Sequence, residues 1–170
     1  LSAEMLRRFL VFVDLADDEL SAISGISRLR TCGAGKRLFR EGACAEHLFL
    51  LDEGRAAIKV RCPDGREEVL DEVGPGDVLG WSAVVAPYRY TASAWTETHC
   101  RLVEVDGAGL RALCERNHHL GYAVAKNISD VMARRYGRAM GGSGDLKLKD
   151  LRAFQGEEHL VWAEGDVVVT

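Results

Sequence analysis

Leu48-Phe49-Leu50-Leu51-Asp52-Glu53-Gly54-Arg55-Ala56, residues 48–56, joins two apolar runs through an acidic pair and a glycine. This pattern is typical of two short strands that meet at a tight turn. It recurs between residues 31 and 105, where short apolar segments alternate with turns such as Glu41-Gly42, Pro63-Asp64-Gly65 and Gly74-Pro75-Gly76-Asp77. Strands at this spacing predict a β-sandwich or jelly roll, and the Asp64-Gly65 pair predicts a hairpin.

Helical periodicity precedes and follows this strand-rich region. Residues 3–30 carry apolar residues near helical spacing, and the acidic run Asp17-Asp18-Glu19 marks the start of a second short helix, where the helix dipole favours negative charge. Beyond the strands, we expect one helix over residues 108–116 and a longer one over residues 119–140.

The longer helix is apolar on two sides. One apolar line consists of Leu120, Val124, Ile128 and Val131, and a second consists of Met132, Tyr136 and Met140. A helix of this kind is expected to pack on the barrel and also on a partner, which predicts a homodimer through residues 119–140. Its basic residues are interpreted as a solvated face that complements the C-terminal helix dipole; they are Lys126, Arg134, Arg135 and Arg138.

Length and composition exclude several classes of protein. The 170 residues suffice for one domain with its own core. With 22 Lys+Arg against 26 Asp+Glu, the net charge of −4 gives no general attraction to nucleic acid or to an anionic membrane. No apolar run reaches the length of a transmembrane helix. The five cysteines form no CxxC pair, so we expect reduced cysteines and a cytoplasmic protein.

A glycine-rich break divides the chain into two parts. Gly141-Gly142-Ser143-Gly144 has the composition of a flexible linker, which predicts a main domain over residues 1–140 and an extension over residues 141–170. In the extension we expect a short helix followed by a small hairpin. A DNA-reading helix-turn-helix is not expected there, because the extension carries three Lys+Arg against six Asp+Glu.

Four segments of the predicted barrel, taken in order along the chain, match the pattern of a known family. Gly35–Gly42, the segment 48–56, Gly74–Gly80 and Cys100–Val105 together resemble the cyclic nucleotide-binding domain family, the sensor module of catabolite-activator-type regulators, kinases and channels. The resemblance covers about residues 6–140. It implies an α+β fold, in which a β jelly-roll barrel is flanked by N-terminal helices and a long C-terminal helix. It also implies cyclic AMP or cyclic GMP as the ligand.

The resemblance weakens at the ligand-binding cassette. The family pattern is approximately F-G-E-L-A-L, a short gap and P-R-A-A-T-V, and this chain has Leu79-Gly80-Trp81-Ser82-Ala83-Val84 and then Pro87-Tyr88-Arg89-Tyr90-Thr91-Ala92. Trp81 stands where family members use a glutamate to hold the ribose hydroxyl. Tyr90 stands where they use an arginine to pair with the cyclic phosphate. Charge-assisted hydrogen bonds contribute about 1.5–3 kcal/mol each, so losing both weakens binding by about 10²- to 10⁴-fold.

The candidate ligand-binding residues lie in this cassette, and they are Gly80, Trp81, Ser82, Ala83, Arg89, Tyr90 and Thr91. In the family, the amides of residues 80–83 open a short helix, whose N-terminus attracts phosphate. Arg89 either replaces the missing phosphate ligand or faces solvent in a loop. Trp81 and Tyr90 either line a pocket for a flat ligand, stack on each other, or fill the cavity. Ser82 and Thr91 offer hydroxyl groups to a phosphate.

No catalytic or metal site is predicted. The histidines are scattered and lack the HxH spacing with a following glutamate that a metal-dependent cupin enzyme needs. His47 with Glu41 or Glu46 is a conceivable partial site, but a surface loop is the preferred interpretation. No nucleophile with an adjacent base and no phosphate-binding P-loop is recognisable.

Two function hypotheses follow. In the first, the chain is a non-catalytic regulatory sensor: a cyclic nucleotide or another planar molecule binds at residues 79–92 and shifts the helix 119–140, which reports to the dimer partner. In the second, it is a structural or dimerisation module with a vestigial pocket that no longer binds cyclic nucleotides. A cupin-like enzyme is a third class and would require a stoichiometric metal. Neither direct nucleic-acid contact nor membrane contact is expected.

Overall fold

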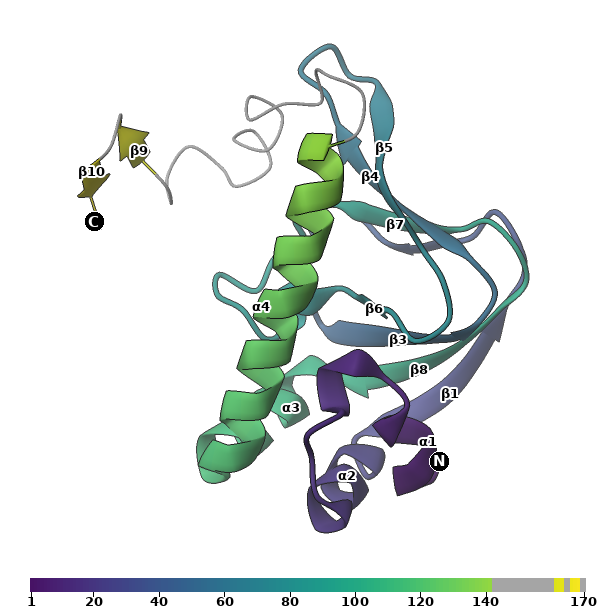
Figure 1. The fold of residues 1–170 in the computed structure, drawn as a ribbon. Helices are drawn as coiled ribbons and strands as arrows, with labels where there is room; N and C mark the ends of the chain where they lie inside the picture. The colour runs from purple at the N-terminus through teal and green to yellow at the C-terminus, as the bar shows by residue number, and fades with distance from the viewer. Residues whose placement is uncertain (142–160, 164–165, 169–170) are drawn as a thin grey trace.

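The computed structural model describes residues 1–141, 161–163 and 166–168. Its centre is a barrel of two antiparallel four-stranded sheets, ordered β1-β8-β3-β6 and β2-β7-β4-β5 (Figure 1). The chain crosses repeatedly between the two sheets, as in a jelly roll, so the predicted fold class is confirmed. The strands are β1 (Ser27–Cys32), β2 (Arg37–Phe39), β3 (His47–Glu53), β4 (Ala56–Arg61), β5 (Glu67–Val73), β6 (Val78–Leu79), β7 (Ser93–Thr96) and β8 (Cys100–Asp106).

The predicted hairpin joins β4 to β5. Arg61 pairs with Glu67 at its closed end, and the amide of Cys62 donates to the carbonyl of Arg66 at 2.7 Å. Gly65 has a φ of +87°, a conformation that side chains with a Cβ rarely adopt, which explains why the Asp-Gly signal was informative.

Helices cover one end and one side of the barrel (Figure 1). Three short elements precede it, a further turn lies after β6, and two helices follow β8. They are α1 (Ala3–Arg7), the 3-10 helix η1 (Leu10–Phe12), α2 (Asp17–Ser24), the 3-10 helix η2 (Trp81–Ala83), α3 (Gly107–Arg116) and α4 (His118–Gly141). The two predicted C-terminal helices are therefore confirmed within two residues at each end.

The prediction of helix as far as residue 30 was wrong at its C-terminal end. α2 ends at Ser24, and β1 begins at Ser27 and pairs with β8 over its whole length, from Ser27 opposite Val105 to Cys32 opposite Cys100. The strand is selected by a partner that lies 68 to 78 residues further along the sequence. Local apolar periodicity cannot report such a partner, because it describes only the residues within the segment.

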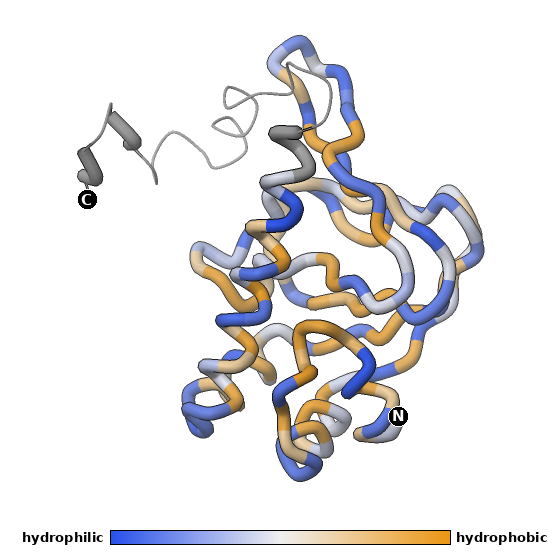
Figure 2. The backbone as a smooth tube through the Cα atoms, viewed as in Figure 1, coloured by the Kyte–Doolittle hydropathy of each residue, from blue (hydrophilic) through white to orange (hydrophobic). Residues whose placement is uncertain are grey.

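Two apolar clusters hold these elements together. One fills the barrel between the sheets, with Phe49, Leu51, Leu79 and Leu102 among its buried members. The other lies between the barrel and the helices. Figure 2 shows hydrophobic residues recurring along the strands and along the helices. The predicted inner line of α4 belongs to this second cluster and is confirmed; it consists of Leu120, Val124, Ile128 and Val131.

The second apolar line and the basic face predicted for α4 are only partly as expected. Met132 is half-buried against the second cluster and Tyr136 is exposed, while the side chain of Met140 lies outside the described residues. Arg135 was expected on a solvated face, and this was wrong: it is buried and forms an ion pair with Asp71 of β5. A buried cation is stable here because a carboxylate from another part of the chain meets it.

Beyond residue 160 the structure describes one antiparallel pair of short strands. Its strands are β9 (Val161–Ala163) and β10 (Asp166–Val168), with Trp162 opposite Val167. The predicted short helix of the extension lies outside the described residues. No helix in the described part of the chain is long and apolar enough to cross a membrane.

A buried carboxylate ties α2 to the junction between α3 and α4. Glu19 accepts a hydrogen bond from the Ala16 amide at 2.9 Å and from Asn117 Nδ2 at 2.8 Å, and His119 Nδ1 lies 2.9 Å from its Oε1. Burial by itself would raise the pKa of Glu19, but these hydrogen bonds outweigh burial and lower the pKa below its ordinary value. The charged form of Glu19 therefore stabilises the fold.

We expect Glu19→Gln to lower the free energy of unfolding at pH 7 by about 1–3 kcal/mol, because charge-assisted hydrogen bonds are replaced by neutral ones. Since its pKa is lowered on folding, Glu19 contributes its full stabilisation at any pH above its ordinary pKa, and that stability is lost as the pH falls through the folded pKa. Urea unfolding between pH 3 and 7 measures both effects. The matched control is Asp18→Asn, at an exposed neighbour in the same helical turn, and an equal loss in the two variants would contradict this account.

Candidate functional site

The cassette begins with a glycine turn that leads from β6 into η2. Gly80 has a φ of +74°, and a Cβ there would lie 3.0 Å from the carbonyl oxygen of His47 and 3.1 Å from Cε1 of Tyr90. The turn therefore requires glycine on two grounds, backbone conformation and space. The predicted short helix at residues 81–83 is present as η2, whose Ser82 and Ala83 are buried.

Tyr90 lies directly beneath this turn. Its side chain is 6% exposed, and its ring stacks on Phe39 of β2 with 4.0 Å between centroids and 14° between planes. Phe39 in turn lies 5.8 Å from the ring of Phe49 in β3. The backbone of Tyr90 is also fixed, since its amide donates to Ala43 at 2.9 Å and its carbonyl accepts from Gly42 at 2.8 Å.

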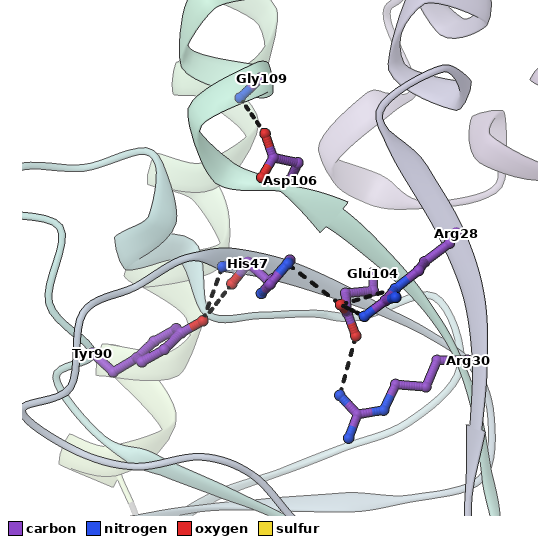
Figure 3. A network of polar contacts seen from close by, with 7 residues as sticks. All are labelled: Arg28, Arg30, His47, Tyr90, Glu104, Asp106 and Gly109. Carbon is purple, nitrogen blue, oxygen red and sulfur yellow. Dashed lines mark hydrogen bonds and ion pairs between the residues drawn. The ribbon is translucent and has the colours of Figure 1, made fainter.

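The hydroxyl of Tyr90 bridges the backbone of one residue, as Figure 3 shows. It donates to the carbonyl oxygen of His47 at 2.7 Å and accepts from the amide of His47 at 3.2 Å. Burial raises the pKa of Tyr90, so the hydroxyl remains protonated at neutral pH and keeps its donor role.

The network continues from His47 to a buried carboxylate on β8 (Figure 3). His47 Nε2 lies 3.4 Å from Oε1 of Glu104, and Glu104 accepts hydrogen bonds from Arg28 Nη2 at 2.6 Å and Arg30 Nη1 at 3.1 Å. Burial alone would raise the pKa of Glu104, but the two arginines and His47 lower it below its usual range. Through His47 and Glu104, the Tyr90 side chain is thereby linked to β3, β8 and β1.

The remaining predicted residues have different surroundings. Arg89 is exposed, and its Nη1 donates to the carbonyl oxygen of Gly42 at 3.1 Å. Trp81 is half-buried and packs against the cluster between barrel and helices, and Thr91 is half-buried. The ring on which Tyr90 stacks belongs to Phe39 rather than to Trp81.

One residue outside the cassette, Arg111, contacts it and was not predicted from the sequence. Arg111 of α3 donates from Nη1 to the carbonyl oxygen of Ala83 at 2.6 Å, and its guanidinium lies 4.2 Å from the ring centroid of Tyr88. The cassette is therefore clamped to α3 by a hydrogen bond and a cation–π contact. Nothing in the sequence around Arg111 signalled this, because both partners lie in a different segment.

Metal chemistry finds no support in the part of the chain that the structure describes. No group of three or more His, Cys, Asp or Glu residues there is placed to hold a metal ion. The acidic neighbour of His47 is Glu104, whereas Glu41 accepts a hydrogen bond from the amide of Arg61 at 3.0 Å. The conceivable pairing of His47 with Glu41 or Glu46 is therefore not the pairing observed.

A jelly roll followed by a long helix, with a glycine-led turn between β6 and η2, is the arrangement of a cyclic nucleotide-binding domain. The family model of the cyclic nucleotide-binding domain matches residues 29–117. The chain belongs to the cyclic nucleotide-binding domain family.

Its relatives in this family include transcriptional regulators. The chain is 29% identical over 149 residues to the CRP-like cAMP-activated global transcriptional regulator of Mycobacterium tuberculosis, covering 87% of this chain and 64% of that protein. It is 34% identical over 117 residues to the transcriptional regulator LdrP of Thermus thermophilus, covering 68% and 54%. The chain therefore spans less than two thirds of the length of these relatives. A solved structure from Geobacter metallireducens, assigned to the cyclic nucleotide-binding class, matches with a TM-score of 0.73 and 32% identity over 80% of this chain and 98% of that one.

We expect Tyr90→Phe to lower the free energy of unfolding by about 1–2 kcal/mol, because the change removes two buried hydrogen bonds and leaves the stacked ring in place. Chemical denaturation measures the loss. Tyr88→Phe is the matched control: it removes a hydroxyl from an exposed ring in the same segment and is expected to change stability by less than about 0.5 kcal/mol. Equal stability of Tyr90→Phe and the parent protein would show that the bridge to His47 contributes nothing.

Proposed function

We propose that the chain is a regulatory module whose cassette is closed to cyclic AMP and cyclic GMP and whose state is transmitted through α4 to a second copy of the chain. The observation that carries the first part is the burial of Tyr90 on Phe39, beneath the Gly80 turn. This favours the second hypothesis drawn from the sequence, a vestigial pocket in a module that assembles through its long helix.

The residues present do not fit a cyclic nucleotide through the contacts that the family uses. A cyclic phosphate carries a negative charge, and the phenol of Tyr90 offers one neutral donor that is already engaged with the carbonyl of His47. Arg89 is the nearest cation in the sequence, but its guanidinium is exposed and engaged with Gly42. Trp81 has no carboxylate to accept a ribose hydroxyl. A ligand would therefore have to displace the Tyr90 ring without gaining a charged partner at that position.

The alternative, in which the cassette binds a cyclic nucleotide, also has support. The Gly80 turn leads into the short helix η2, where the resemblance places the phosphate-binding amides, and one relative is described as cAMP-activated. In that case a ligand would bind through the amides of the turn and would move Tyr90 aside. The two proposals predict opposite responses to added nucleotide.

We expect no change in the thermal unfolding temperature of the parent protein with millimolar cyclic AMP or cyclic GMP. In a folded double variant, Trp81→Glu with Tyr90→Arg, the charged partners are restored and a saturable increase of several degrees is expected. The size follows from about 2.7 kcal/mol at a ligand concentration of 100 times Kd and about 2–4 °C per kcal/mol for a chain of this size. Thermal unfolding monitored by circular dichroism measures both. A saturable increase in the parent would support the sensor alternative instead.

The outer side of α4 supports the second part of the proposal. Five exposed positions lie on the side of the helix opposite Leu120 and Val131, and we call them the α4 stripe: Tyr122, Ala125, Ser129, Ala133 and Tyr136. Tyr122 is 71% exposed and Tyr136 is 48% exposed. Tyr122, Ser129 and Tyr136 recur every seven residues, and the two alanines lie between them. Two large aromatic side chains separated by small residues suit close contact with another helix.

We expect the parent chain to form a dimer and Ser129→Arg to raise the dissociation constant of that dimer at least tenfold, because the new side chain places a charge at the centre of the α4 stripe. Sedimentation velocity over a concentration series measures it. The matched control is Asp130→Arg, which adds the same side chain at the next exposed position, off the stripe. A parent that stays monomeric, or a dimer indifferent to Ser129→Arg, is incompatible with this interface.

A further inference from the structure

A buried ion pair fixes the C-terminal part of α4 to the barrel. Arg135 Nε lies 3.3 Å from Oδ2 of Asp71, and the two side chains are 8% and 6% exposed. Nη2 of Arg135 also donates a hydrogen bond to the carbonyl oxygen of Val78. One side chain of α4 therefore contacts both β5 and β6, which lie in different sheets.

This contact lies where the apolar packing of α4 ends. Val131 is the last buried apolar residue in the described part of the helix, and Met132 is half-buried beside it. One turn further on, Arg135 is buried while its neighbours Arg134 and Tyr136 are exposed. The place of this turn on the barrel therefore depends on polar contacts rather than on the apolar core.

The chemistry of the pair favours one defined position. A guanidinium donates from fixed directions in a plane. Here Nη2 donates to the carbonyl oxygen of Val78, while Nε lies within ion-pair distance of the Asp71 carboxylate. An apolar contact would tolerate small shifts along the helix axis. A buried charge that moves away from its partner is instead left unpaired in a poorly solvated site, which is strongly unfavourable. The turn is thus either docked or released.

The pair also connects two sites that are otherwise separate. Val78 precedes Gly80 by two residues, so Arg135 binds the strand that leads into the cassette turn. Tyr136 follows Arg135 and is the last residue of the α4 stripe. A change in this contact therefore acts on both the cassette strand and the surface that faces a partner.

We propose that Asp71 and Arg135 are positioning residues: their ion pair docks the C-terminal part of α4 onto β5 and β6 and so sets where Tyr136 lies in the contact with a second copy of the chain. The docking stands on the contacts within one chain, whereas its effect on assembly rests on the proposed function of the α4 stripe.

Hydrogen exchange on the full chain tests the docking. In Asp71→Asn and in Arg135→Met, we expect the amides of residues 132–137 to exchange at least tenfold faster, and those of residues 120–131 to exchange as in the parent. Two exposed neighbours supply matched controls, Glu72→Gln on β5 and Arg134→Met on α4, and neither is expected to change exchange in α4. Unchanged exchange at residues 132–137, or equal acceleration along all of α4, would overturn the proposal.

Arg135→Lys provides a second route if the neutral variants do not fold. It retains the charge and loses the planar arrangement of donors, so we expect faster exchange confined to residues 132–137 here also. The same absence of local acceleration in a folded Arg135→Lys protein would contradict the docking.

Sedimentation separates the effect on assembly from the docking itself. We expect Arg135→Met to raise the dissociation constant of the dimer at least tenfold and Arg134→Met to leave it unchanged. An unchanged constant in Arg135→Met, with local exchange accelerated, would overturn the role in assembly and retain the docking. A monomeric parent would overturn that role together with the proposed dimer, while the exchange result would still decide whether the pair docks α4.

Discussion

The contact between Tyr90 and Phe39 is the constraint on which the cassette depends. The stacked ring fills the space beneath Gly80, and its hydroxyl satisfies both backbone groups of His47 at the start of β3. The resemblance drawn from the sequence places Tyr90 at the position of a ligand-binding arginine, and in this chain the Tyr90 side chain binds the protein itself. Because the aromatic ring and the hydroxyl are both engaged, opening the site would cost apolar burial and two hydrogen bonds together.

In the proposed function, control comes from within the chain rather than from a bound nucleotide, and two arginine contacts support this proposal. Arg111 holds the carbonyl of Ala83 at the end of the cassette, and Arg135 holds the strand before it. Both arginines belong to the helices that follow the barrel, so the cassette is connected to α3 and α4 by side chains. α4 is packed on its inner side and presents aromatic residues on its outer side. This arrangement suits a helix that joins two copies while fixed to the barrel beneath it.

Much of the fold was predictable because its signals are local. The turn at Asp64-Gly65 and the spacing of Leu120, Val124, Ile128 and Val131 each describe one segment, and the structure confirms them. Residues 27–30 were predicted wrongly, since β8 decides their conformation from a distance. The same applies to Arg135, whose burial depends on Asp71, and to Tyr90, whose stacking partner lies 51 residues earlier at Phe39. The sequence pointed to the unusual residues of the cassette but not to what they contact, because those contacts join segments that are remote along the chain.

The most direct test of the closed cassette is a crystal structure of the chain grown with millimolar cyclic AMP. We expect the closed arrangement, with Tyr90 stacked on Phe39, its hydroxyl bonded to the backbone of His47, and no nucleotide beneath the Gly80 turn. A nucleotide bound against residues 80–83, with the Tyr90 ring displaced from Phe39, would contradict it.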